Sequence, residues 1–207
     1  MSNTTLLHEL IALSANSSPG TIALSHGGNL ISYGELLDEV TRFSSGLMHL
    51  GIQRGERVAI YLEKRFETVI ASFGATAAGG VFVPLNPLLK AEQVGYILRD
   101  CNVRVLVTSP ERLALLQETL PACRDLRHVV VLDSAEPLPT IDGLNLCRWR
   151  DLLAAPAMPG HRVIDTDVVG ILYTSGSTGK PKGVVLSHRN MVAGAKSVAS
   201  YLENRAD

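Results

Sequence analysis

The sequence predicts an α/β fold in which a parallel sheet is built from βαβ units and flanked by helices. Four short runs rich in Val, Ile and Leu are separated by three segments whose apolar residues recur at helical spacing. The expected strands are residues 57–62, 81–85, 104–108 and 128–132, and the expected helices are residues 66–78, 91–100 and 110–120. The strand runs are continuously apolar instead of alternating, which is typical of parallel strands covered on both faces. Right-handed crossovers between such strands place helices on the faces of the sheet.

The chain before the first of these strands predicts a helix, a hairpin and a second helix. Apolar residues recur at helical spacing over residues 6–13. The turn sequence Gly-Gly-Asn at residues 27–29 lies between two short apolar runs, which indicates a β-hairpin. Ser32 stands three residues before Glu35, the spacing of a capping box. We therefore expect a helix to begin there and to end near Gly51.

The pattern changes after residue 133. Residues 134–167 contain several prolines and little periodicity, so we expect a linker with one short helix around Trp149–Leu153. The later elements expected are strands at 168–174 and 183–187 and a helix over 188–202 with Ser187 as its cap. The sequence thus divides into an α/β subdomain at 1–133, the linker, and the first strands of a second subdomain at 168–207, which form a phosphate-loop hairpin.

Composition and charge argue against several classes of protein. A net charge of -1 gives no global reason to expect nucleic acid or an anionic membrane as a partner. The longest uncharged run, residues 68–89, has the length of a membrane span, but its glycines and prolines would break such a helix. We therefore expect no membrane span. Cys101, Cys123 and Cys147 are odd in number and widely spaced, which fits neither a disulfide framework nor a zinc site and favours a reducing cytoplasm.

The segment ILYTSGSTGKPKGVVLS, residues 171–187, carries the strongest chemical signal. A polyphosphate requires inward backbone N–H groups, hydroxyl donors and a cation. The candidate ligands are the hydroxyls of Thr174, Ser175, Ser177 and Thr178, the backbone at Gly176, Gly179 and Gly183, and the cations Lys180 and Lys182. A flexible Gly/Ser surface loop is the alternative. Against that alternative, the loop is short, is flanked by apolar strands and is stiffened by Pro181.

The loop does not have the Walker A pattern. That pattern has four residues between its glycines and a Ser or Thr directly after the lysine. Here Gly176 and Gly179 are separated by two residues, and Lys180 is followed by Pro181. The downstream pattern also predicts a strand and not a helix, so we do not expect a P-loop kinase or GTPase.

The segment YTSGSTGKPKGV resembles, nearly residue for residue, the signature loop of the AMP-forming acyl-CoA synthetase family. That family also includes the adenylation domains of peptide synthetases and the luciferases. Two weaker resemblances agree with it. Residues 31–47 look like the family's early Tyr-x-Glu-Leu helix, and residues 77–100 look like its next motif, a strand that ends in Pro-Leu-x-Pro. Together the three motifs cover most of the chain.

The resemblance implies a two-step ligase that uses ATP and Mg²⁺. A carboxylate attacks the α-phosphate to give an acyl-adenylate, and a thiol, either coenzyme A or that of a carrier protein, then displaces AMP. By position, the residues implied to hold the β- and γ-phosphates are Thr174, Ser175, Gly176, Ser177, Thr178 and Lys182, with Gly179 and Lys180 in the same loop. Tyr33, Glu35 and the segment 84–87 are expected to serve the fold. No catalytic residue or metal ligand is assigned.

The second motif reads Pro-Leu-Asn-Pro-Leu-Leu-Lys, where peptide-synthetase domains more often have Asp before the second Pro. This departure favours an acyl-CoA synthetase, with a fatty acid as the expected substrate. The alternatives are an amino-acid or aryl-acid adenylation domain and a non-catalytic nucleotide-binding module. In the family, the acid pocket and the catalytic lysine follow the signature loop. We therefore expect an N-terminal part of a longer enzyme, inactive by itself and prone to self-association through residues 168–185.

Overall fold

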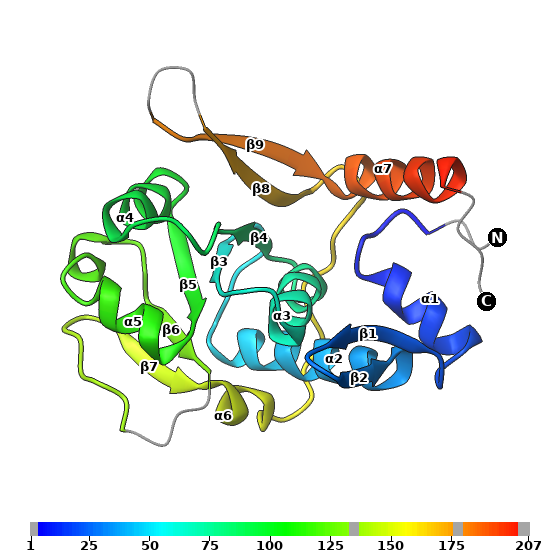
Figure 1. Cartoon of the computed structure of the whole chain (residues 1–207), viewed down its shortest axis with the longest axis horizontal. Helices are drawn as coiled ribbons and strands as arrows, with labels where there is room; N and C mark the ends of the chain where they lie inside the picture. The colour runs from blue at the N-terminus through cyan, green and yellow to red at the C-terminus, as the bar shows by residue number, and fades with distance from the viewer. Residues whose placement is uncertain (1–3, 133–136, 176–179, 203–207) are drawn as a thin grey trace.

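The computed structural model describes residues 4–132, 137–175 and 180–202, and within them most strands form one seven-stranded sheet (Figure 1). The order across this sheet is β7-β6-β5-β3-β4-β8-β9. Its strands are β3 (Arg57–Tyr61), β4 (Val81–Pro84), β5 (Val103–Thr108), β6 (His128–Val131), β7 (Asn145–Arg148), β8 (Val168–Thr174) and β9 (Lys182–Ser187). Neighbouring strands are parallel except for the last pair, β8 and β9, which are antiparallel. The predicted α/β fold with a parallel sheet is confirmed.

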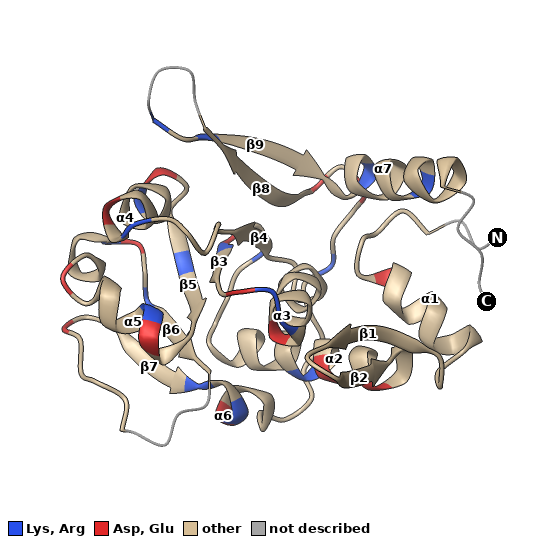
Figure 2. Ribbon diagram, in the orientation of Figure 1, with Lys and Arg blue, Asp and Glu red and all other residues tan. Residues whose placement is uncertain are grey.

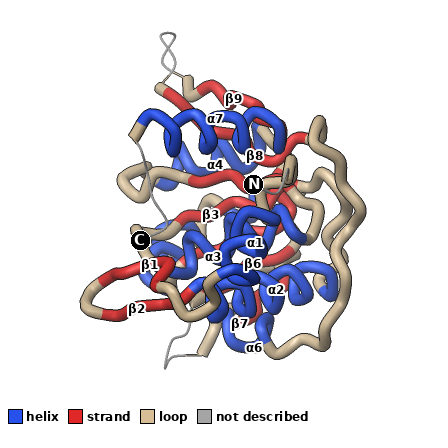
Figure 3. The backbone as a smooth tube through the Cα atoms, turned by 90° about the vertical axis from the view of Figure 1, so that its right-hand side faces the viewer, coloured by secondary structure: helices blue, strands red, loops and turns tan. Residues whose placement is uncertain are grey.

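Helices cover both faces of the sheet. One face packs against α2 (Tyr33–His49), α3 (Phe66–Ala77) and α6 (Trp149–Leu153), and the other packs against α4 (Ala91–Asp100) and α5 (Pro110–Leu116). The remaining elements are α1 (Glu9–Ser17), the hairpin β1 (Ile22–His26) and β2 (Asn29–Ser32), the short 3-10 helix Leu120–Ala122 and α7 (His188–Tyr201). Figures 1 and 3 show α7 and the β8–β9 hairpin at one side of the molecule, with α2 and α6 at the opposite side.

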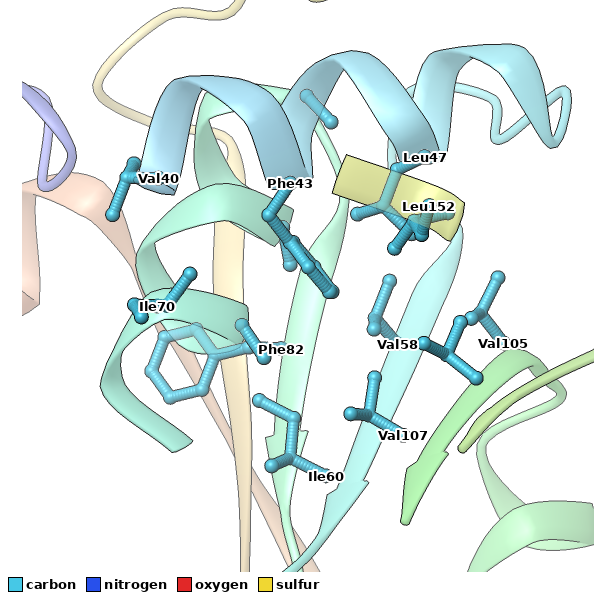
Figure 4. Close-up of a cluster of buried hydrophobic side chains, with 14 of the residues drawn as sticks. Val40, Phe43, Leu47, Val58, Ile60, Ile70, Phe82, Val105, Val107 and Leu152 are labelled. Atoms are coloured by element: carbon cyan, nitrogen blue, oxygen red, sulfur yellow. The ribbon is translucent and has the colours of Figure 1, made fainter. Parts of the chain in front are cut away.

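Successive side chains of the central strands enter two separate apolar clusters. Val58 and Ile60 of β3 belong to the cluster under α2 and α3, whereas Ala59 and Tyr61 belong to the cluster under α4 and α5. Figure 4 shows Phe43 of α2 directed at the first of these clusters. Full burial of one such large apolar side chain contributes roughly 1.5–3 kcal/mol. The continuous apolar runs in the sequence therefore reflect burial on both faces.

Most local predictions are confirmed by the structure. β1 and β2 form the expected antiparallel hairpin, in which Gly27 and Gly28 both have positive φ, as a tight two-residue turn requires. Ser32 and Glu35 form the expected capping box at the start of α2. A second capping box joins Ser187 to Asn190 at the start of α7.

Two elements differ from the prediction. β7 lies within the range that we expected to be a linker, and it pairs in parallel with β6. Its sequence, Asn-Leu-Cys-Arg, is too short and too polar to give an apolar run. α5 ends at Leu116 and not at residue 120, and a short 3-10 helix occupies Leu120–Ala122 instead. The boundaries of the proposed subdomains stay a prediction.

Among the described residues, no helix combines the length and the apolar character needed to cross a bilayer. This agrees with the expectation from the broken uncharged run at residues 68–89.

Two helical glycines give a matched test of how α6 packs on α2. A Cβ at Gly46 in α2 would lie 2.5 Å from the carbonyl oxygen of Leu152 in α6, whereas a Cβ at Gly194 in α7 would meet nothing within 4 Å. We expect Gly46→Ala to lower the free energy of unfolding by about 1–3 kcal/mol through overpacking. Gly194→Ala should raise it by up to about 1 kcal/mol, because alanine is the better helix former. Urea titrations of both variants measure this, and equal effects at the two positions would contradict the packing of α6 on α2.

Candidate nucleotide-phosphate site

The β8–β9 hairpin brings the two ends of the signature loop together at one edge of the sheet. β8 runs parallel to β4, so Thr174 at its carboxyl end lies at the same edge as Pro84. β9 returns antiparallel, and Lys182 faces Thr174 across the hairpin. In open α/β sheets, ligands bind outside the carboxyl ends of the strands. Thr174 and Lys182 therefore lie opposite each other on the two strands, at the edge where a ligand is expected.

A pocket of about 470 Å³ lies between this hairpin and the segment that links β4 to α4. Its lining comprises Pro84, Leu85, Asn86, Leu89, Gln93 and Ile97 on one side and Tyr173, Thr174, Ser175 and Pro181 on the other. Most of these residues are apolar, with hydroxyl and amide groups at the loop end. This is the usual composition of a small-molecule site.

The charge of the hairpin suits an anion. Residues 168–202 contain four basic residues and no acidic residue. Lys180 and Lys182 are exposed, and none of the ion pairs formed among the described residues includes either of them. Figure 2, in which Lys and Arg are blue, shows blue where β9 meets the loop. Both lysines are thus available to phosphate oxygens.

A second groove, of about 520 Å³, is a poorer candidate for a phosphate ligand. It lies between the β1–β2 hairpin, α2 and α3, and its lining contains four carboxylates and one arginine. The charged lining residues are Glu35, Asp38, Glu39, Glu67 and Arg42. Because like charges repel, a triphosphate would be disfavoured there.

Tyr173 joins the hairpin to α4. Its hydroxyl donates a hydrogen bond of 2.6 Å to the Oδ2 atom of Asp100, the last residue of α4. Burial raises the pKa of Tyr173, and the hydrogen bond to the Asp100 carboxylate raises it further. The hydroxyl therefore stays protonated and remains a donor at neutral pH.

The other end of the hairpin is held by His188, the first residue of α7. Its side chain is 1% exposed, and its Nδ1 atom accepts a hydrogen bond of 3.0 Å from the backbone N–H of Leu7. Burial lowers the pKa of His188 to about 4, and repulsion by His8 contributes. The neutral imidazole thus ties α7 to the N-terminal segment.

Two ion pairs add to this anchor. Arg189 approaches Asp165 to 2.8 Å, and Arg54 approaches Asp167 to 2.7 Å, so the segment that leads into β8 is tied to α7 and to Arg54. Exposed pairs of this kind contribute up to about 1 kcal/mol each.

The structure brings together four of the residues predicted for the site. Thr174, Ser175, Lys180 and Lys182 all lie at the loop end of the hairpin. The other predicted residues, Gly176, Ser177, Thr178 and Gly179, lie outside the described residues. Phosphate binding by any of them stays a prediction.

Sequence reasoning missed several residues around the site. The segment 84–87 was assigned to the fold alone, yet Pro84 and Asn86 line the pocket. Asp100 and Tyr173 were not singled out as a pair, because they are distant in sequence and no local pattern links them. One signal was present in the sequence. Asp100 lies at the carboxyl end of a predicted helix, where the helix dipole disfavours a negative charge, and this indicates a partner elsewhere in the fold.

Comparison with known proteins shows the family. The family model described as AMP-binding enzyme matches residues 11–207. The chain therefore belongs to the AMP-binding enzyme family, which comprises adenylate-forming ligases. It is 32% identical over 182 residues to a crotonobetaine/carnitine–CoA ligase of Escherichia coli. It is 30% identical over 190 residues to gramicidin S synthase 2 of Brevibacillus brevis.

These matches cover most of this chain and a smaller part of each relative. They span 87% of this chain and 34% of the CoA ligase, and 92% of this chain and 4% of the gramicidin S synthase. The fold resembles that of a putative long-chain-fatty-acid CoA ligase from Rhodopseudomonas palustris, with a TM-score of 0.87 and 20% identity. That likeness covers 98% of this chain and 49% of the other.

The buried His188 predicts a pH dependence of stability. Its pKa is lower in the folded chain than the ordinary value of 6.5, so its stabilising effect is complete above that pH. As the pH falls from about 6.5 to about 4, the unfolded chain binds a proton at this histidine more readily than the folded chain does. The free energy of unfolding therefore falls by up to about 3 kcal/mol. An asparagine side chain does not titrate and would retain an acceptor for the N–H of Leu7, so His188→Asn should flatten this decline.

Urea titrations at several pH values measure this effect. The exposed His26→Asn serves as a matched control and should keep the wild-type decline. An unchanged profile in the His188→Asn variant would contradict a neutral, buried imidazole at this position.

Proposed function

We propose that this chain holds the phosphates of ATP in an ATP-dependent acid–thiol ligase that forms an acyl-adenylate. The observation that carries the proposal is the pairing of Thr174 with Lys182 at the carboxyl edge of the sheet, across the mouth of a loop rich in hydroxyls. A hydrogen bond to a charged group contributes roughly 1.5–3 kcal/mol, so a few such donors offset much of the hydration lost by a triphosphate.

The proposed role is to neutralise a leaving group. A carboxylate oxygen of the acid attacks the α-phosphorus of ATP, the bond to the bridging oxygen breaks, and pyrophosphate leaves with the electron pair. A thiol then attacks the acyl carbon and AMP leaves. In the first step, the loop hydroxyls and Lys182 stabilise the charge that develops on pyrophosphate. None of the proposed ligands acts as a nucleophile.

Magnesium fits the donors available at this site. Thr174 and Ser175 offer hydroxyl oxygens, and oxygen is the ligand that Mg²⁺ prefers. When bound with ATP, Mg²⁺ supplies charge neutralisation on the phosphate oxygens. Within the chain, the same hydroxyls orient the β- and γ-phosphates relative to Lys182.

We propose coenzyme A as the thiol acceptor and a fatty acid as the substrate. The Pro-Leu-Asn-Pro segment and the relative named as a CoA ligase support an acyl-CoA synthetase. The alternative is an amino-acid or aryl-acid adenylation domain whose acceptor is a carrier-protein thiol. The match to gramicidin S synthase 2 at 30% identity favours that alternative. A non-catalytic nucleotide-binding module is the remaining possibility.

Two further expectations receive support from the described residues. Cys101, Cys123 and Cys147 are free thiols, which suits a reducing cytoplasm. Val184 and Val185 on the edge strand β9 are 45% and 57% exposed. An exposed apolar edge strand is prone to pair with another chain, so self-association stays our expectation.

Substitution of Lys182 tests the phosphate site. We expect Lys182→Ala to weaken ATP binding about 10- to 100-fold, because a charge-assisted contact to the β- or γ-phosphate is lost. AMP lacks both phosphates, so its affinity should not change. Isothermal titration calorimetry of this chain with MgATP and with AMP measures both effects. Lys196→Ala removes the same charge on α7 and should bind ATP as the wild type does.

Equal ATP affinity in the Lys182→Ala and Lys196→Ala variants would contradict the proposed site. The same conclusion would follow if AMP and ATP lost affinity equally, because the affected contact would then not involve the terminal phosphates.

Exchange of radioactive pyrophosphate into ATP tests the substrate class. The panel contains fatty, aryl and amino acids, and both this chain and any longer product of its reading frame are assayed. We expect exchange with fatty acids and none with aryl or amino acids. Exchange driven only by amino or aryl acids would support the alternative, and no exchange with any acid would support a non-catalytic module.

A further inference from the structure

The carboxylate of Asp100 lies where a helix disfavours it. Asp100 is the last residue of α4, and the partial negative charge at a helix carboxyl end repels a carboxylate. Its side chain nevertheless points to the hairpin and accepts the 2.6 Å hydrogen bond from the hydroxyl of Tyr173. A residue that breaks a local preference in this way is often retained for a contact elsewhere in the fold.

A second contact joins the same helix to the other side of the hairpin. The Nζ atom of Lys180 lies 6.0 Å from the centre of the Tyr96 ring. Tyr96 stands four residues before Asp100, so both side chains lie on one face of α4. This face therefore lies near both Tyr173 and Lys180 of the signature segment.

Backbone pairing with β4 supports β8 only at some distance from the loop, although Ile171 and Leu172 pack against the apolar clusters. Gly170 is the single residue of β8 in register with β4 among the described residues, and it lies four residues before Thr174. From Ile171 onward, the described residues of β8 pair only with β9. Contacts with α4 therefore add to the orientation of β8 at Thr174, and the pocket beside Thr174 lies between this strand end and α4.

We infer that Tyr173 and Asp100 are positioning residues, which set the distance between α4 and the end of β8 from which the phosphate-binding loop departs. Tyr173 directly precedes Thr174, so its hydrogen bond fixes the backbone from which the first predicted phosphate ligand projects. This inference rests on the proposed function, because that function assigns phosphate binding to the loop. The pair is not proposed to contact the nucleotide. It holds the strand end that carries the predicted phosphate ligand Thr174.

Removal of the Tyr173 hydroxyl tests the inference with two independent measurements. Trypsin cleavage after Lys182 requires local opening of the hairpin, and mass spectrometry follows this bond without any ligand present. Cleavage after the exposed Arg162 serves as an internal reference. We expect Tyr173→Phe to raise the rate after Lys182, relative to the rate after Arg162, by about three- to tenfold. ATP affinity, measured by calorimetry, should fall over a similar range.

Further variants separate positioning from general stability. Asp100→Ala should match Tyr173→Phe, and the double variant should be no worse than either single one, because all three lack the same hydrogen bond. Asp100→Asn keeps an acceptor oxygen and should recover part of the effect. Tyr33→Phe removes a tyrosine hydroxyl from the start of α2 and should leave both measurements unchanged.

Unchanged cleavage in Tyr173→Phe, or additive losses in the double variant, would overturn the inference. If the wild-type chain does not bind ATP, the proposed function is contradicted, and the cleavage rates still decide whether the pair positions the loop. A fall in ATP affinity without faster cleavage would also overturn positioning, since it would point to direct contact with the nucleotide.

Discussion

The parallel pairing of β8 with β4 determines where the signature loop can lie. The two strands meet where Gly170 packs against Phe82, and a Cβ at Gly170 would approach the Phe82 ring to 3.0 Å. A larger residue at this position would therefore require the Phe82 ring to shift. Because β8 and β4 run in the same direction, their carboxyl ends emerge at one edge, and Thr174 and Ser175 line a pocket together with the segment that leads into α4.

The rest of the fold makes this edge rigid. β3, β5 and β6 are buried on both faces, so the centre of the sheet cannot shift without exposing apolar side chains. The hairpin itself is solvated on much of its surface and is held at its ends, by His188 near α7 and by Tyr173 near α4. Binding residues are often carried by loops that a rigid scaffold positions.

Predictions from the sequence succeeded where the signal is local. Continuous apolar runs identified β3 to β6, and the spacing of Ser32 and Glu35 identified the capping box of α2. β7 was missed because it is a strand of only four residues at the edge of the sheet, and so short a strand carries almost no periodic signal. The contact of Tyr173 with Asp100 was missed for a different reason: it depends on how the hairpin twists over α4, which tertiary packing decides and local propensity does not.

The most direct test of the central claim, that the hairpin loop holds the ATP phosphates, is a crystal structure of the chain with Mg²⁺ and a non-hydrolysable ATP analogue. The account predicts β- and γ-phosphate oxygens within hydrogen-bond distance of the Thr174 hydroxyl and the Lys182 ammonium. A nucleotide bound with its phosphates away from this hairpin, for instance in the groove beside α2, would contradict it.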